Sequence, residues 1–111
     1  MPFDAEVNAP SKDKLVLQRA RDIVAAGWAQ GGSAESGLAS YRENESSHCA
    51  MNALCISLCD MPGRHGLPAF EHAAQLLGFD WLGAVWAWND APGRTKVEVI
   101  ARFDEAIARL G

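Results

Sequence analysis

The sequence predicts an all-α fold, a compact bundle of four main helices and one short tryptophan-rich helix. Apolar residues recur at three- and four-residue spacing over several segments, and no segment alternates apolar and polar residues for long enough to indicate a strand. The chain has 111 residues, 49% of them hydrophobic and 22% charged. These values are typical of one globular domain with a single core, so residues 1–111 are expected to form one domain.

The first helix is expected to begin after an extended arm, residues 1–10, that contains two prolines. Ser11 is a suitable N-cap, and the apolar face of the helix continues to about Ala26. Gly27 is predicted to end the helix in the left-handed conformation, with Trp28 folding back onto the core. Residues 31–47, rich in glycine, serine and charge, are predicted to be a long loop, either a solvated insertion or a lid.

The segment from His48 to Cys59 is apolar almost all round, which predicts a buried central helix capped by Ser46 or Ser47. Its few polar and thiol side chains fall on one narrow stripe, within about 60° of each other at the helical spacing. The stripe consists of His48, Asn52, Cys55 and Cys59.

Pro68 predicts the start of a third helix that ends at Gly78, with Leu67 and Phe70 on its inward face and His72 in solvent. Asp80 is then expected to cap a short helix over residues 81–88 with three tryptophans. Tryptophans so close together favour a ridge of the core, formed by Trp81, Val85 and Trp88 on one face and by Leu82 and Trp86 on the next.

Pro92 and Gly93 predict a type II turn over residues 91–94. Thr95 and Glu98 have the spacing of a capping box, so a last helix is expected from Thr95 to Leu110. Its apolar stripe contains Val99 and Phe103. The opposite side is expected to face water and carries Glu98, Arg102, Glu105 and Arg109.

Composition excludes several classes of protein. The formal net charge of −4 and scattered basic residues argue against a nucleic-acid partner, which requires a basic face. No apolar run approaches the ~20 residues that cross a bilayer, and no secretory signal is visible at residues 1–6. The three cysteines are an odd number crowded into eleven residues, which favours reduced thiols and a cytoplasmic protein.

Two places are candidates for chemistry. The first is the corner around the predicted turn, where an aromatic wall stands beside an amide, a carboxylate and a guanidinium. Its residues are Trp88, Asn89, Asp90 and Arg94, joined by Trp28 and Gln30. Either these polar groups form a structural clasp that satisfies the indole N–H groups, or they line a pocket for a small polar ligand.

The second place is the start of the central helix. Cys49 beside His48 suits a nucleophile if its pKa is lowered, whereas Cys55, Cys59 and His48 are too few for a zinc site. The other interpretation is a packed helix whose cysteines act as small hydrophobic residues. No catalytic residue, metal or cofactor is assigned.

The chain resembles a small bacterial domain of unknown function that is found largely in actinobacteria. The resemblance covers about residues 15–110, and its most specific part is the turn Trp-Asn-Asp-Ala-Pro-Gly-Arg-Thr at residues 88–95. Weaker parts are Gly27-Trp28 with Gln30, Cys49-Ala50 and Ala53-Leu54. The resemblance implies a helical domain without an established activity. Cys55 and Cys59 depart from its pattern.

The leading hypothesis is a non-enzymatic module that binds a protein or a small molecule at the corner. The alternative is a small hydrolase or transferase that uses Cys49 or Asp90 with His48. A homodimer is a third possibility, with Leu38, Tyr41 and Trp28 as its apolar face.

Overall fold

The structure is a computed structural model, and it describes residues 11–30, 48–61 and 66–111. These residues form α2 (Lys12–Ala26), α4 (Ala50–Cys59), α5 (Leu67–Leu76), α6 (Leu82–Asn89) and α7 (Lys96–Arg109). The all-α prediction is confirmed, since the described part contains only one isolated bridge of strand type, between Trp28 and His48. The arm expected at residues 1–10 and the loop expected at 31–47 lie outside the described residues.

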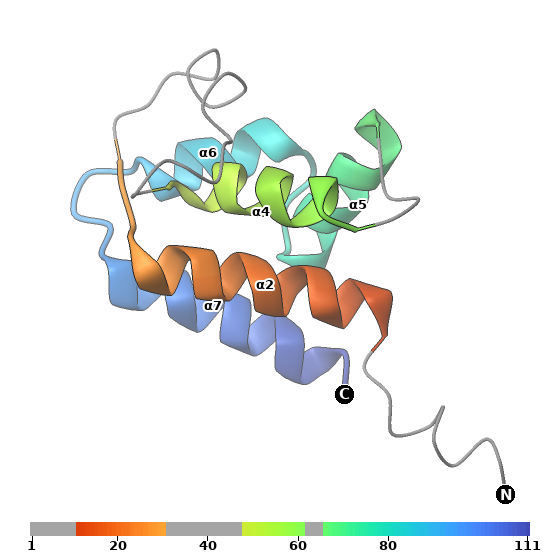
Figure 1. Cartoon of the computed structure of the whole chain (residues 1–111). Helices are drawn as coiled ribbons and strands as arrows, with labels where there is room; N and C mark the ends of the chain where they lie inside the picture. The colour runs from red at the N-terminus through yellow and green to blue at the C-terminus, as the bar shows by residue number, and fades with distance from the viewer. Residues whose placement is uncertain (1–10, 31–47, 62–65) are drawn as a thin grey trace, which may run out of the picture.

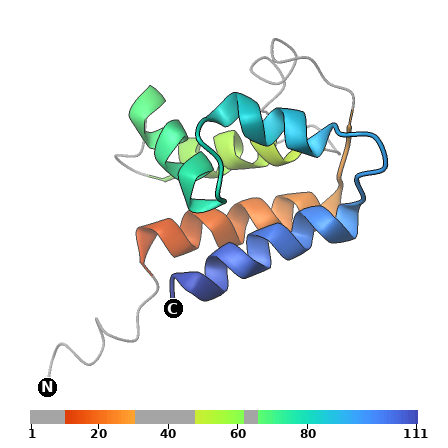
Figure 2. The same cartoon turned by 180° about the vertical axis from the view of Figure 1, so that it is seen from behind.

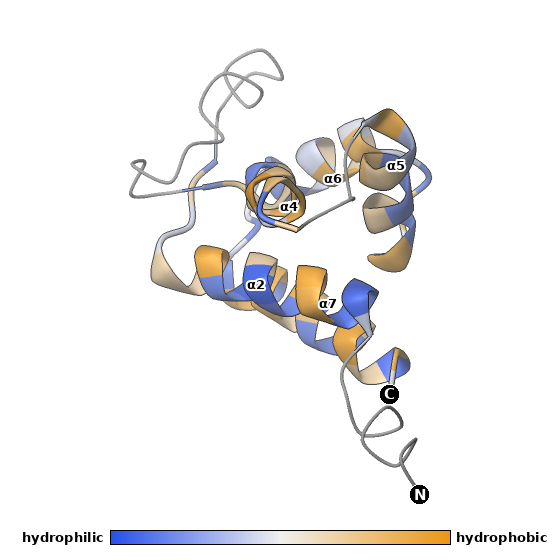
Figure 3. Cartoon of the chain, turned by 45° about the vertical axis from the view of Figure 1, so that its right-hand side comes forward, coloured by the Kyte–Doolittle hydropathy of each residue, from blue (hydrophilic) through white to orange (hydrophobic). Residues whose placement is uncertain are grey.

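The helices form two layers (Figure 1). One layer contains α2 and α7, which lie side by side, and the other contains α4, α5 and α6. The view from behind shows the same division (Figure 2). Figure 3 shows α4 nearly end-on, above α2 and α7 and beside α6, with most of its ribbon in the colours of hydrophobic residues.

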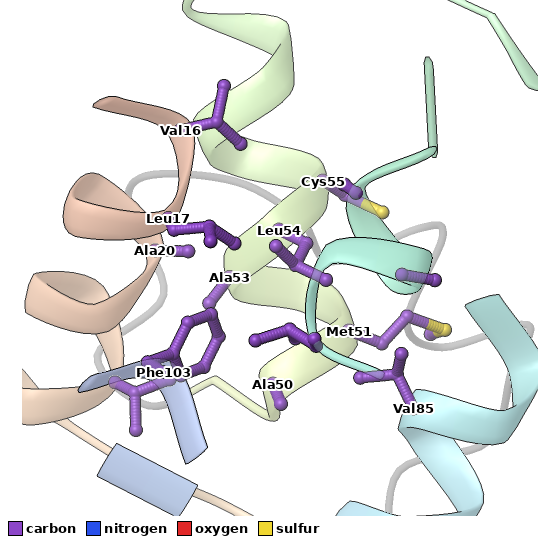
Figure 4. Close-up of a cluster of buried hydrophobic side chains, with 14 of the residues drawn as sticks. Val16, Leu17, Ala20, Ala50, Met51, Ala53, Leu54, Cys55, Val85 and Phe103 are labelled. Carbon is purple, nitrogen blue, oxygen red and sulfur yellow. The ribbon is translucent and has the colours of Figure 1, made fainter. Parts of the chain in front are cut away.

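Helix α4 is the centre of the core, as its composition predicts. Every residue from Ala50 to Leu58 is buried. Its side chains pack against Leu17 of α2, Val85 of α6 and Phe103 of α7 (Figure 4). The Ser57 hydroxyl donates to the Val16 carbonyl over 2.7 Å, so this buried polar group is satisfied by α2. Cys59, the last member of the predicted stripe, is exposed.

Helices α2 and α4 end at Ala26 and Cys59 as predicted, but the predicted conformation of Gly27 and the predicted start of α4 were wrong. Gly27 has an extended backbone, with φ −175°, instead of the left-handed conformation. The reason is that its carbonyl accepts a hydrogen bond from His48 N over 2.9 Å, which holds both segments extended. Helix α4 therefore starts after Cys49, whose sulfur caps it by accepting from Asn52 N, and not at His48 as predicted. The caps expected at Ser46 or Ser47 lie outside the described residues.

Two large side chains placed in the core by their spacing are exposed. Leu67, 65% exposed, is the first residue of α5 after Gly66 (φ +86°) and lies at the edge of the bundle. Trp81, 59% exposed, is itself the N-cap of α6 in an extended conformation, a position predicted for Asp80. Helical spacing does not apply to a residue outside the helix, so the expected ridge is lost at Trp81.

The end of the chain follows its local signals. Arg94 N donates to the Ala91 carbonyl over 3.0 Å, and Gly93 has φ +83°, as a type II turn requires. Both hydrogen bonds of the Thr95–Glu98 capping box are present. The prediction that Arg102 faces water was wrong, because its guanidinium lies over the Phe79 ring.

His72 is exposed, as predicted, and it also contacts Asp13 of α2 at 3.1 Å. This pair joins α5 to the other layer. At an exposed position such a contact contributes at most ~1 kcal/mol.

Replacing the cap of α7 tests how far its first turn depends on a side chain. Thr95→Ala removes the acceptor for Glu98 N, so the free energy of unfolding should fall by about 1 kcal/mol. Lys96→Ala, one residue further on and without a capping role, is the control and should change it by less than ~0.5 kcal/mol. Equal values for the two variants in urea unfolding would contradict the role of the cap.

Candidate functional site

The corner is built around the side chain of Asn89, the last residue of α6, which is fully buried. Its Oδ1 accepts from Trp28 Nε1 over 2.7 Å and from Ala50 N over 3.0 Å. Its Nδ2 donates to the Ala29 carbonyl and to Asp90 Oδ1, each over 3.0 Å. An amide has two donor hydrogens and two acceptor lone pairs, so the hydrogen-bonding capacity of this side chain is filled within the chain.

These contacts join three parts of the chain that are distant in sequence. Trp28 and Ala29 follow α2, Ala50 begins α4, and Asn89 ends α6. Gln30 adds to the junction, since its Nε2 donates to the carbonyls of Asn89 (2.9 Å) and Ala91 (3.1 Å). The corner therefore has the geometry of a clasp between the two layers.

Trp88 lies beside this clasp with cations near its ring. The Arg94 guanidinium is 4.3 Å from the ring centroid, and Arg94 Nε donates to the Trp88 carbonyl over 3.0 Å. The Arg102 guanidinium is 5.2 Å from the same ring and 4.6 Å from the ring of Phe79. Sequence reasoning missed Arg102 and Phe79 here, because neither is near the turn in sequence.

The structure brings the two predicted places together. His48 forms the bridge with Trp28, and Cys49 directly precedes Ala50, which donates to Asn89. All eight candidate residues consequently lie in one region, at or next to the corner. They are Trp28, Gln30, His48, Cys49, Trp88, Asn89, Asp90 and Arg94.

The thiols differ from what a nucleophile needs. Burial raises the pKa of Cys49, although three backbone N–H groups near the thiol, those of Asn52, Met51 and Cys49, oppose this effect. Burial, and secondarily the nearby Cys59, raises the pKa of Cys55 to about 12. In the described residues no three metal-ligating side chains come together. The condition stated for a nucleophilic Cys49, a lowered pKa, is not met.

A groove between α4, α5 and α6 was not predicted from the sequence. It has a volume of about 360 Å³ and is lined by Met51, Leu67, Phe70, Glu71, Trp81, Leu82 and Gly83. The exposed Leu67 and Trp81 belong to its walls. A Cβ atom at Gly83 would lie 2.3 Å from the Trp81 ring, so the absence of a side chain there lets the indole pack against α6.

The Asn89 clasp makes a sharp prediction for the variant Asn89→Asp. A carboxylate would face the Ala29 carbonyl and Asp90 instead of donating to them. The variant should lose about 3 kcal/mol or more at pH 7, because it leaves a buried, unpaired charge. Burial would raise the pKa of the new carboxyl, so the loss should be smallest below its unfolded pKa of about 3.9 and grow as the pH rises.

Denaturant unfolding at pH 4 and pH 7, each compared with wild type at the same pH, measures this effect. Gln30→Ala removes two hydrogen bonds from an exposed side chain of the same corner and should cost less than ~1.5 kcal/mol at either pH. A loss for Asn89→Asp no larger than that of Gln30→Ala would refute the clasp.

The thiols should react with Ellman's reagent in two classes. At pH 7.5 only the exposed Cys59 should react quickly in the native protein, while Cys49 and Cys55 react only as the protein unfolds. Cys59→Ser should remove the fast phase. A fast phase that persists in this variant would contradict this prediction, because it would show that Cys49 or Cys55 is reactive in the native protein.

Within the described residues, no helix combines the length and the apolar character needed to cross a membrane. Comparisons with curated proteins and with solved structures found no similar protein. A model of one family matches residues 9–109, nearly the whole chain. The domain of unknown function expected from the turn motif is thereby confirmed, and the chain belongs to the family of unknown function DUF6197.

Proposed function

We propose that this chain is a non-enzymatic binding module whose ligand site is the groove between α4, α5 and α6. The observation that carries the proposal is the exposed indole of Trp81, which is held against Gly83 as one wall of that groove. In this proposal the corner around Asn89 is the clasp that keeps the helices in place.

The corner supports the structural role better than the ligand role that its composition suggests. The four hydrogen bonds of the Asn89 side chain are all made within the chain. A ligand at this amide would have to displace one of them and leave a buried group unsatisfied, which costs roughly 1–3 kcal/mol. The Asn89 side chain at the centre of the corner therefore has no hydrogen-bonding capacity left for a ligand.

The groove has the opposite character. Its walls are mainly apolar, and its volume of about 360 Å³ lies at the lower end of the range of small-molecule sites. Two large apolar side chains that line it, Leu67 and Trp81, are more than half exposed. An apolar ligand would remove part of this surface from water at a gain of ~25 cal/mol per Å².

The enzymatic alternative, a cysteine- or aspartate-dependent hydrolase or transferase, receives less support. Its cysteine version depends on a thiolate, and burial raises the pKa of Cys49. The homodimer also stays a prediction, which sedimentation at two concentrations tests. Of the residues expected on its face, Leu38 and Tyr41 lie outside the described residues, and Trp28 is engaged with Asn89.

The four tryptophans give a direct assay for the site. Titration with the neutral ligand 3-phenylpropan-1-ol, followed by ¹⁵N NMR, should shift the indole N–H signal of Trp81 and leave that of Trp28 in place. The reason is that Trp81 lines the groove whereas the Trp28 N–H is bound to Asn89. Trp81→Ala should weaken binding by roughly fivefold or more, since it removes one apolar wall.

Trp86→Phe is the matched control, because Trp86 is on the same helix but does not line the groove. It should leave the affinity within a factor of about two. Shifts centred on Trp28 and Asn89 would instead place the ligand at the corner. Binding that survives Trp81→Ala unchanged would also overturn the assignment to the groove.

A further inference from the structure

The groove has an acidic side chain and, among the described residues, no basic one. Glu71 of α5 is one of its described lining residues, and none of these is a lysine or an arginine. Asp80, which directly precedes Trp81, is exposed. Among the described residues, neither carboxylate has an ion pair or hydrogen bond. The groove that contains the exposed Trp81 therefore has one acidic side chain in its wall, and a second acidic residue directly precedes that tryptophan.

Another indole of this chain, that of Trp88, has cations beside its ring. It is approached by two guanidinium groups, those of Arg94 at 4.3 Å and Arg102 at 5.2 Å from the ring centroid. The electron-rich face of an indole attracts such cations. Among the described residues, no cation lies over the Trp81 ring, which packs against Gly83 and lines the groove.

From this juxtaposition we propose that the ligand of the groove is an organic cation, an ammonium group on an apolar body. The inference rests on the proposed function and names its ligand class. The apolar body would lie against Met51 and Leu82 at the base of the groove, and the ammonium group would lie between the Trp81 ring and the Glu71 carboxylate. The ring and the acid come from different elements, α5 and the start of α6, and meet only in the folded chain.

Charge favours this ligand over a neutral or an anionic one of the same shape. An anion would approach Glu71 and a chain of net charge −4, and no base is among the described residues of the groove to receive it. A neutral ligand would bury the same apolar surface but gain nothing from the acid. A cation gains both the attraction to the indole face and that to the carboxylate.

Three compounds that share a phenylalkyl group and differ in the charge of the terminal group test the inference. They are 3-phenylpropylammonium, 3-phenylpropan-1-ol and 3-phenylpropanoate. Their dissociation constants at pH 7 are measured from the Trp81 indole N–H shift. The ammonium ion should bind roughly three- to thirtyfold more tightly than the alcohol, and the propanoate should bind most weakly. The preference should shrink at high salt, since both charge contacts are near the surface.

Glu71→Gln should reduce the preference for the ammonium ion by roughly two- to fivefold and leave the affinity for the alcohol unchanged. Glu105→Gln, on the exposed side of α7 outside the groove, removes the same charge and should alter neither affinity. A Glu105→Gln effect as large as that of Glu71→Gln would show only general electrostatics and would overturn the site.

The experiment separates the two proposals. Equal binding of the ammonium ion and the alcohol at Trp81 would overturn the cationic ligand and leave the binding module intact. If none of the three compounds moves the Trp81 signal, both proposals fail. Binding of all three at Trp81, with the ammonium ion tightest and the order dependent on Glu71, supports both.

Discussion

The buried amide of Asn89 is the contact on which the arrangement of this fold depends. It is the point where the end of α6, the start of α4 and the segment after α2 meet, and each of its hydrogen bonds goes to a different group. Apolar packing is tolerant of small displacements, whereas a buried amide with four partners is satisfied in one geometry. This amide holds α6 in its position against α4. The groove depends on the same position, because its walls come from α4, α5 and α6.

The parts of this fold that the sequence predicts well are those with local causes. The capping box at Thr95 and the turn at Gly93 need only neighbouring residues, and both are present as expected. Helix α4 was predictable because nearly all its residues are apolar, which leaves burial on every side as the only stable arrangement. A clasp at the corner was one of two interpretations of the sequence, but the indole that donates to Asn89 is that of Trp28 and not one from residues 81–88.

The parts that failed have causes distant in sequence. Gly27 is extended because its carbonyl accepts from His48, twenty-one residues away, and the same contact moves the start of α4 to Cys49. Arg102 was expected in water because its helix face is charged, but Phe79 and Trp88 lie beside it. Spacing along one helix cannot reveal which neighbour covers a face. The groove was missed for the same reason, since its walls come from three helices.

The contacts of the tryptophans distinguish structural residues from a candidate binding residue more clearly than their spacing in the sequence does. Trp28 gives its N–H to Asn89, and Trp88 has arginines near its ring, so each meets its main requirements within the chain. Trp81 is more than half exposed, and it has neither a hydrogen bond from its N–H nor a cation over its ring among the described residues. Polar residues at a corner first attract attention as a site, yet internal partners use their capacity. A large apolar side chain that is exposed to water without partners is a better indication of a binding surface. In the described residues that side chain is Trp81, which lines the groove together with Glu71.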